Sequence, residues 1–365
     1  MDFAFSEEQQ MLRDSARGYL AEKYGTDDVA ELARSDEGWR PESFPEIAEL
    51  GWTGLSVPES DGGSGMGFID EVVIFEELGY ALYPGPYFSS VALALPALPA
   101  GHALAAAIAS GDRTATVAWA EPPGRAVITD TSDIKTKAEK SNGAWSLTGE
   151  KHLVPDLGVV DVVIVTATAD DGVGLWVVER DAAEIRARST MDSTRRYGDL
   201  VLSGVTGELL VEPGDAAAVL NAIRTKALAA AAVEAVGVGQ RALELAIEHV
   251  KERKQFDKAI GSYQAVSHQV ANSFVEIELA RSLAYWAAWC VDESDDQVTA
   301  AVPGAKAAAG EAAVGACERA IQVHGGIGFT WEHPLHLFYK RAQWLNSFDA
   351  FPTQQRSEVA QSLLG

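Results

Sequence analysis

TATVAWA, at residues 114–120, opens the stretch of sequence that decides the fold. Four more β-rich runs follow it: IKTKAEK (134–140), AWSLTGEKHLV (144–154), VVDVVIVTATA (159–169) and VGLWVVER (173–180). Turn signals separate the runs, among them Asn142-Gly143 and Asp171-Gly172. We therefore expect a compact antiparallel β domain that ends near Pro213.

Helical periodicity lies on both sides of this β domain. Before it, apolar residues recur at helical spacing between Ser6 and Tyr24, and further helices are expected after Pro41 and from about Phe68. After it come three long periodic segments, which form an antiparallel bundle when short connections join them. These segments cover roughly 215–253, 262–292 and 298–323. The sequence predicts an α+β multidomain fold with an N-terminal helical domain (1–112), a middle antiparallel β domain (113–214) and a C-terminal four-helix bundle (215–365).

Composition excludes several classes of protein. A chain of 365 residues exceeds the size of one hydrophobic core, and 47% hydrophobic with 22% charged residues is typical of a globular protein. The net charge of -24 repels phosphate backbones and anionic membrane surfaces, so we expect no nucleic-acid and no membrane partner. Two cysteines cannot form a disulfide framework, and the first residues lack a signal-peptide pattern. We expect a cytoplasmic protein.

Two motifs in the C-terminal segment carry a family resemblance. Arg253-Lys254-Gln255-Phe256, with Ile260 and Gln264 after it, precedes Gln322-Val323-His324-Gly325-Gly326-Ile327-Gly328-Phe329. Together they resemble the paired signatures of the acyl-CoA dehydrogenase family. The stretches FPEIAELGWTGLSVPESDGGSGMG (44–67) and IKTKAEKSNGAWSLTGEKH (134–152) extend the resemblance to nearly the whole chain.

The resemblance implies an FAD-containing oxidoreductase that converts an acyl-CoA thioester to its trans-2-enoyl product. A carboxylate removes the acidic α-proton and the β-hydride passes to the flavin, which requires a base in a dry cleft. In this family FAD lies at a dimer interface, where the neighbouring subunit's C-terminal domain holds its adenosine-pyrophosphate half. The acceptor that the family implies is an electron-transferring flavoprotein.

The resemblance also implies which residues reach a neighbour's FAD. Arg253 would pair with the pyrophosphate and Phe256 would pack against the cofactor, while Gln255 and Gln264 belong to the same motif. In the second motif, Gln322, Gly325 and Gly326 would allow the backbone to approach FAD closely. Asp257 stands where the family usually has glycine.

On the side that would hold the chain's own flavin ring, the sequence departs from the family. Ala120-Glu121-Pro122-Pro123-Gly124-Arg125 stands where the family has T-E-P-x-x-G-S-D. Leu153-Val154-Pro155 stands where the family commonly has Trp-Ile-Thr, and proline offers neither an amide N–H nor a hydroxyl. These changes predict that hydrogen bonds to the chain's own flavin are lost.

The catalytic base is predicted by aligning residues 340–356 on the family segment that ends in Tyr-Glu-Gly-Thr, which places Asp349 at the base position. Aspartate is one methylene shorter than glutamate, and a misplacement of ~1 Å can cost about a hundredfold in rate. The other family location for the base aligns near Ala227, which offers no carboxylate.

The one-sided losses lead to the hypothesis of a heteromeric enzyme. In this hypothesis the chain is one subunit of a heterotetramer that completes the FAD site of a paralogous acyl-CoA dehydrogenase subunit. TWEHPLHLFYKRA (330–342) resembles actinobacterial pairs that degrade steroid side chains and similar bulky acyl-CoA esters. Three alternatives stay open: a self-sufficient homotetramer using Asp349, a catalytically silent partner subunit, and a member of the fold with other CoA-thioester chemistry.

Other features favour structural roles. Glu234, in an alanine-rich run, is expected to be paired, and Gly237–Ala242 is expected to be a helix-packing patch because no strand precedes it. The histidines His324, His333 and His336 with Glu332 fit no strong zinc template, so we expect surface or interface histidines and no metal site. The glycine run 62–67 lacks the Lys-Ser or Lys-Thr of a phosphate-binding loop.

Overall fold

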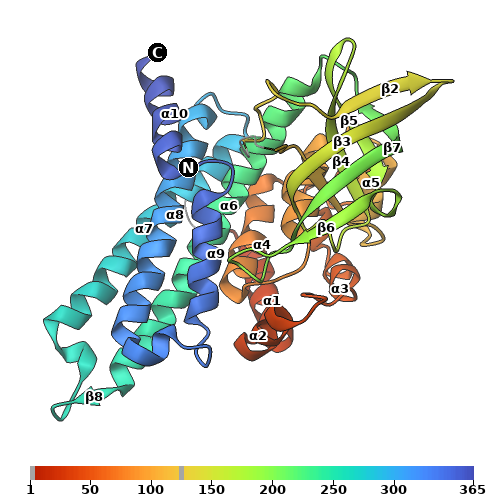
Figure 1. Ribbon diagram of the computed structural model, residues 1–365. Coiled ribbons are helices and arrows are strands. Elements are labelled where there is room, and N and C mark those ends of the chain that lie inside the picture. Colours follow the sequence, from red (N-terminus) through yellow and green to blue (C-terminus); the bar gives the residue numbers. More distant parts are fainter. Residues whose placement is uncertain (1–4, 123–126) are drawn as a thin grey trace. The chain divides into compact units, whose positions relative to one another are not determined.

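The computed structural model describes residues 5–122 and 127–365, which divide into two compact units (Figure 1). The first, here the helical unit, comprises Met1–Ser35, Phe68–Tyr83 and Leu228–Gly365. The second, here the sheet unit, comprises Asp36–Gly67 and Pro84–Ala227. The boundaries inferred from the sequence, at residues 112 and 214, stay a prediction.

The helical unit is built around α8, which packs against α7, α9 and α10 (Figure 1). Ser6 and Gln9 form a capping box at the start of α1, which satisfies amide groups that the first turn leaves free. The helices are α1 (Glu7–Lys23), α2 (Thr26–Arg34), α4 (Phe68–Ala81), most of α6 (Ala216–Glu252), α7 (Gln264–Asp292), α8 (Val298–His324), α9 (Leu335–Ser347) and α10 (Pro352–Leu364).

Small residues let these helices approach one another closely. A Cβ added at Gly237 of α6 would lie 2.0 Å from the carbonyl oxygen of Glu76 on α4, and one at Gly310 of α8 would lie 2.6 Å from the Asn346 amide oxygen. The helix-packing role predicted for the glycines near 237 is therefore confirmed. Among the described helices, α6 alone is long and apolar enough to span a membrane by composition, but 56% of its most apolar window is buried, as expected of a core helix.

The sheet unit contains one seven-stranded sheet. Its pairings run β4–β2–β3–β7–β5 and return from β5 to β4, so the sheet closes into a barrel; β1 pairs with β4 and β6 with β7. Asn142 and Gly143 both have positive φ, 53° and 86°, as a two-residue hairpin turn between β2 and β3 requires. The strands are β1 (Ala115–Ala118), β2 (Lys137–Ser141), β3 (Ala144–Pro155), β4 (Val162–Ala169), β5 (Gly172–Glu179), β6 (Glu184–Arg188) and β7 (Tyr197–Val211), and the unit also holds α3 (Ser43–Glu49) and α5 (Ala103–Ala109).

The interior of this barrel is apolar. Trp176, Leu147 and Leu200 are fully buried in it, with smaller valine and alanine side chains between them. A Cβ added at Gly207 would lie 2.5 Å from the Leu147 side chain and 3.2 Å from that of Trp176. These two large side chains therefore fill the space beside the glycine. The alternating strands therefore form a packed core rather than an open channel.

The predicted fold class is confirmed, with two differences in detail. The sheet is mixed rather than purely antiparallel, because β1 pairs parallel with β4 and Lys137 of β2 also pairs parallel with Thr168. The segment after residue 215 contains five helices instead of four, since α9 and α10 follow the three long ones.

Candidate functional site

The first predicted motif lies in a small hairpin at the end of α6. Arg253 directly follows the helix, and its N–H donates to the His249 carbonyl oxygen at 2.9 Å. Strands β8 (Lys254–Gln255) and β9 (Lys258–Ala259) flank a two-residue turn. We call residues 253–264 the hairpin segment.

The turn of this hairpin is conformationally unusual. Phe256 and Asp257 have φ of 52° and 62°, which is the left-handed pair that such a turn needs. Aspartate is one of the few residues that tolerate this region, which explains how Asp257 can replace the family's glycine. A phenylalanine there is strained, and the Phe256 side chain is 87% exposed. A strained, exposed aromatic is better explained by contact with another molecule than by packing within this chain.

The second motif is equally open. Gln322 in the last turn of α8 and Gln264 at the start of α7 are both exposed. Gly325 ends α8 with a φ of 66°, and no atom lies within 4 Å of a Cβ placed on Gly325 or Gly326. A ligand or a second chain can therefore approach the backbone here.

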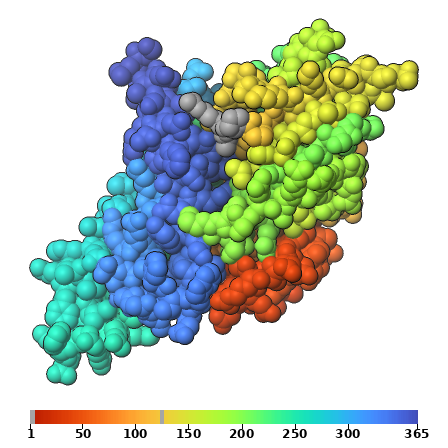
Figure 2. Space-filling model, viewed as in Figure 1, coloured from red at the N-terminus to blue at the C-terminus, as the bar shows by residue number. Residues whose placement is uncertain are grey.

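The structure brings the two motifs together. The rings of His249 on α6 and His324 at the end of α8 are stacked with centroids 4.1 Å apart, which places Arg253 and Gly325 at the same end of the helical unit. In the space-filling view the turquoise surface of the hairpin segment adjoins the blue surface that follows α8 (Figure 2).

These residues fit the phosphate-containing half of FAD. Four cations lie close together in the sequence, Lys251, Arg253, Lys254 and Lys258, against two acidic residues in between, although the whole chain carries a net charge of -24. All four are exposed. A local excess of positive charge beside an exposed aromatic and an open glycine turn suits an anionic cofactor with a planar ring.

Asp349, the predicted base, lies between α9 and α10. Its backbone has a φ of 63° in a tight turn in which the Ala350 N–H donates to the Phe348 carbonyl oxygen at 2.7 Å. The residue is only 7% exposed, with Phe348 and Ala350 buried beside it. Burial away from water is what the chemistry requires of such a base. The catalytic role of Asp349 stays a prediction.

Glu234, the other buried carboxylate considered, is paired as predicted. Its Oε1 accepts from the Arg341 guanidinium at 2.6 Å, and both side chains are at most 1% exposed. Arg341 also donates to the Tyr83 carbonyl oxygen at 3.4 Å. Because its charge is compensated, Glu234 is a structural residue of the helical unit.

The two departures on the chain's own flavin side can be located in the sheet unit. Ala120 is buried, and its carbonyl accepts from the His152 N–H at 2.9 Å. Pro155 ends β3, where it has no amide hydrogen to offer. Pro123, Gly124 and Arg125 of the first departure lie outside the described residues. Ala120 therefore offers no side-chain donor, and Pro155 offers neither a side-chain nor a backbone donor.

Leu153, in the second departure, is held in a strained conformation. Its φ is 50°, and its N–H donates to Asp199 Oδ1 at 3.2 Å. Asp199, Glu150 and His152 have ligand atoms within 4.8 Å of one another, but Arg188 and Arg186 already pair with the two carboxylates. We interpret this cluster, which sequence reasoning missed, as an ion-pair network that fixes the Leu153 backbone. The predicted absence of a metal site stays a prediction.

A buried ion pair joins the same two stretches, and the sequence analysis did not identify it. Lys151 Nζ donates to Glu121 Oε1 at 2.5 Å and to the Thr166 hydroxyl at 2.9 Å. Burial lowers the pKa of Lys151 to about 8, although the carboxylate of Glu121 favours the charged form. Both residues lie inside the motifs that were compared with the family. The signal in the sequence for this ion pair was a lysine at an inward strand position, because a buried lysine needs an acidic partner.

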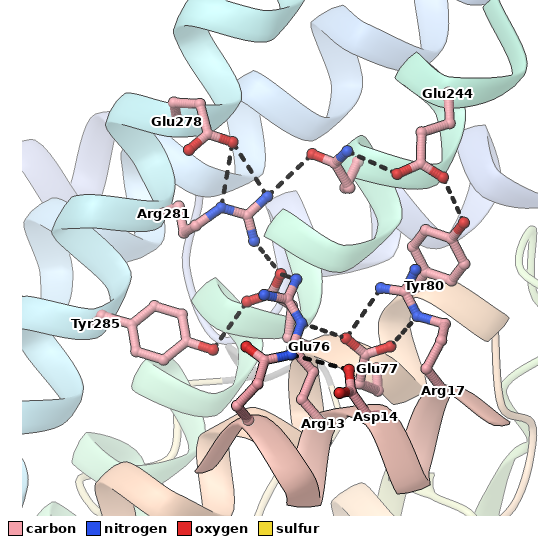
Figure 3. Close-up of polar contacts among 12 residues, drawn as sticks. Arg13, Asp14, Arg17, Glu76, Glu77, Tyr80, Glu244, Glu278, Arg281 and Tyr285 are labelled. Atoms are coloured by element: carbon pink, nitrogen blue, oxygen red, sulfur yellow. Dashed lines mark hydrogen bonds and ion pairs between the residues drawn. The ribbon is translucent and has the colours of Figure 1, made fainter. Parts of the chain in front are cut away.

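Two buried carboxylates on α4, Glu76 and Glu77, form a further polar network in the helical unit. Their partners are Arg13 and Arg17 on α1 and Arg281 and Tyr285 on α7 (Figure 3). Burial, with the carboxylate of Glu76, raises the pKa of Tyr285 well above its usual value. Because the arginines compensate both carboxylates, the network ties three helices together and leaves neither as a free base.

One expectation about the histidines was wrong. His324 is buried rather than at the surface, and it lies between His249 and His333. The rings of His249 and His324 are stacked with centroids 4.1 Å apart, and those of His324 and His333 are tilted by 55° with centroids 4.4 Å apart.

Comparison with known proteins agrees with the fold. Residues 6–102 match the family model of the acyl-CoA dehydrogenase N-terminal domain, and residues 219–363 match that of the C-terminal domain. Acyl-CoA dehydrogenase IpdE2 from Mycobacterium tuberculosis is 31% identical over 92% of this chain and 91% of that protein.

Two solved structures are similar over nearly the full length. The ChsE4-ChsE5 complex from Mycobacterium tuberculosis is 26% identical, covers 100% of this chain and 99% of that chain, and has a TM-score of 0.89. A single-residue variant of the Tcur3481-Tcur3483 steroid ACAD is 27% identical, covers 98% of both chains and has a TM-score of 0.85.

The fold and the site thus define an FAD-dependent oxidoreductase acting on acyl-CoA. The chain belongs to the acyl-CoA dehydrogenase family, and FAD is its cofactor.

Proposed function

We propose that this chain is one subunit of a heteromeric acyl-CoA dehydrogenase, in which its hairpin segment completes the FAD site of a paralogous partner subunit. FAD supplies the hydride acceptor for α,β-dehydrogenation of the thioester. Arg253 neutralises the pyrophosphate, Phe256 packs on the cofactor, and Gly325 with Gly326 admits it to the backbone.

The observation that carries this proposal is the contrast between the two sides of the flavin site. The residues predicted to reach a neighbour's FAD are kept, apart from Asp257 in place of glycine, and they are exposed; Phe256 is held there at the cost of backbone strain. On the chain's own flavin side, Ala120 and Pro155 replace donors. This contrast is expected of a chain that contributes residues to a partner's FAD site but no longer binds a flavin in its own site.

The proposed substrate is a bulky acyl-CoA ester, such as one with a steroid side chain, and the proposed acceptor is an electron-transferring flavoprotein. The similar structure described as a complex of two named chains supports the heteromeric assignment, and the one described as a steroid ACAD supports the proposed substrate class. We propose a cytoplasmic location, consistent with the acidic composition.

The alternative function is a self-sufficient homotetramer that uses Asp349, and its burial in an apolar turn favours that reading. Two substitutions separate the proposals when the chain is co-purified with a paralogous subunit. In the heteromer, Arg253→Ala removes flavin from the partner, whereas Asp349→Asn leaves turnover intact if the base is the partner's. Loss of turnover in Asp349→Asn with flavin retained would instead assign the base to this chain.

The control for Arg253→Ala is Lys251→Ala, which removes an equally exposed cation on the preceding turn. We expect it to retain flavin apart from a modest, salt-dependent loss. An equal loss of flavin in both variants would show that FAD binding depends only on the total positive charge of the hairpin segment. Arg253 would then make no specific contact with FAD.

A further inference from the structure

The histidine stack, defined as His249, His324 and His333, lies inside the end of the helical unit. The three rings come from three different elements: α6, the last residue of α8, and the loop between the 3-10 helix Gly325–Phe329 and α9. The centroids of His249 and His324 are 4.1 Å apart at an interplanar angle of 25°, and those of His324 and His333 are 4.4 Å apart.

Hydrogen bonds fix the orientation of two rings in the stack. His324 Nδ1 donates to the Ala320 carbonyl oxygen at 2.7 Å, one helical turn earlier. His333 Nδ1 accepts from the Leu335 N–H at 3.3 Å, at the start of α9. The stack is therefore a defined arrangement of rings and not a loose surface group.

The stack joins the two halves of the proposed FAD contact. His249 accepts the N–H of Arg253 at its carbonyl, and its ring lies on His324, the residue before Gly325. Gln322 is only two residues earlier on α8. Separating the rings would free the Arg253 end of α6 from the Gly325–Gly326 turn.

The charges that face the stack oppose its protonation. On α6, burial and His324 lower the pKa of His249 and Arg253 lowers it further, while Glu252 alone raises it. From the α9 side, burial lowers the pKa of His333 to about 4, and the other histidines, including His336, add to this. His336 is itself held neutral by burial and by Lys340 and Arg34, which lower its pKa to about 4.

We propose that the histidine stack positions the hairpin segment against the Gly325–Gly326 turn only while its rings are uncharged, so that acidification releases FAD from the site. The inference rests on the proposed function, because it assigns a regulation to that same FAD contact. His324 is thus a positioning residue that touches neither cofactor nor substrate.

The expected size of the effect follows from His333. His333 freed from the stack regains a pKa near 6.5, against about 4 inside it, so this ring alone favours opening by about tenfold at pH 5.5 relative to pH 7.5. His333 is partly exposed, so solvent screening reduces the expected change to roughly threefold to tenfold. The effect grows as the pH falls from about 6.5 toward 4 and is absent above 7.

The test is hydrogen exchange of the peptides around 249–256 and 320–336 at pH 7.5, 6.5 and 5.5, corrected for the intrinsic exchange rate. FAD retention by the co-purified heteromer is measured at the same pH values. We expect exchange from the open form to rise threefold to tenfold at pH 5.5 while α7 stays unchanged, and FAD to dissociate in parallel.

Two variants complete the experiment. His324→Asn keeps a donor for the Ala320 carbonyl but removes the central ring of the stack, so we expect FAD retention to be lower already at pH 7.5 and to change little between pH 7.5 and pH 5.5. His102→Asn is the control, since His102 caps α5 in the sheet unit and asparagine caps equally well; its profile should match the parent protein.

Exchange that is independent of pH in the parent protein would overturn the inference. So would pH-dependent exchange without any change in FAD retention, because the stack would then open without positioning the site. If no heteromer binds FAD even at pH 7.5, the proposed function fails instead, and the exchange data still decide whether acid opens the stack.

Discussion

Lys151→Met is expected to destabilise the sheet unit, because it removes the buried cation that pairs with Glu121. Lys151 is completely buried and its ammonium group is the cationic partner of Glu121, which also accepts from the N–H groups of Lys135 at 2.6 Å and Thr136 at 3.0 Å. Methionine leaves that carboxylate without its counter-ion. Since two backbone hydrogen bonds remain, we expect a loss of about 3 kcal/mol in the free energy of unfolding at pH 7.

The same group predicts the pH dependence of that loss. The folded chain releases the Lys151 proton near pH 8 and the unfolded chain near 10.5, so between these values the unfolded chain binds more protons. Stability contributed by Lys151 therefore rises with pH. From pH 7 to pH 9 the advantage of the parent protein over Lys151→Met should grow by about 1.4 kcal/mol.

Urea unfolding followed by tryptophan fluorescence at both pH values measures this difference. Other alkaline groups, such as Tyr285, cancel because both proteins carry them. The control is Lys135→Met, whose side chain is 61% exposed and whose backbone bond to Glu121 is kept, and it should change stability by less than about 0.5 kcal/mol. A difference between parent and Lys151→Met that stays constant or shrinks from pH 7 to 9 would refute the reasoning.

Two other substitutions follow from the helical unit. Arg341→Met removes the arginine that pairs with the buried Glu234, so the free energy of unfolding should fall by about 3–5 kcal/mol, and the double variant with Glu234→Met should recover most of this loss. Arg356→Met removes the exposed Arg356–Glu311 pair and should cost less than about 1 kcal/mol. Phe256→Gly relieves a φ of 52° and should raise stability by about 1 kcal/mol in calorimetry while weakening FAD retention by the heteromer; a gain in both would contradict the contact assigned to Phe256.

Local periodicity was sufficient to predict the long helices. The segments expected at 215–253, 262–292 and 298–323 appear as Ala216–Glu252, Gln264–Asp292 and Val298–His324. Such helices bury a continuous apolar face, so each carries its own signal over many turns. By contrast α2, Thr26–Arg34, is short and acidic at its start, and no expectation was made for it.

Strand pairing and side-chain partners depend on residues that are distant in the sequence. The parallel pairing of β1 with β4 is set by the barrel as a whole, not by either strand. The sequence indicated that Glu234 needs a partner, because it lies in an apolar run. It did not indicate that this partner is Arg341, which lies 107 residues later. The FAD-contact residues were predicted from motifs, and the structure adds what motifs lack: the exposure of Phe256 and the ring contact between His249 and His324.

The central claim is that this chain donates half of a flavin site and does not hold a flavin of its own without a partner. The most direct test is the flavin-to-chain ratio of the protein purified alone in excess FAD, from visible absorbance against protein concentration. The account predicts a ratio near zero that rises when a paralogous subunit is added. A ratio near one flavin per chain for the lone protein would contradict it, because Ala120, Leu153 and Pro155 would then be compatible with a complete site.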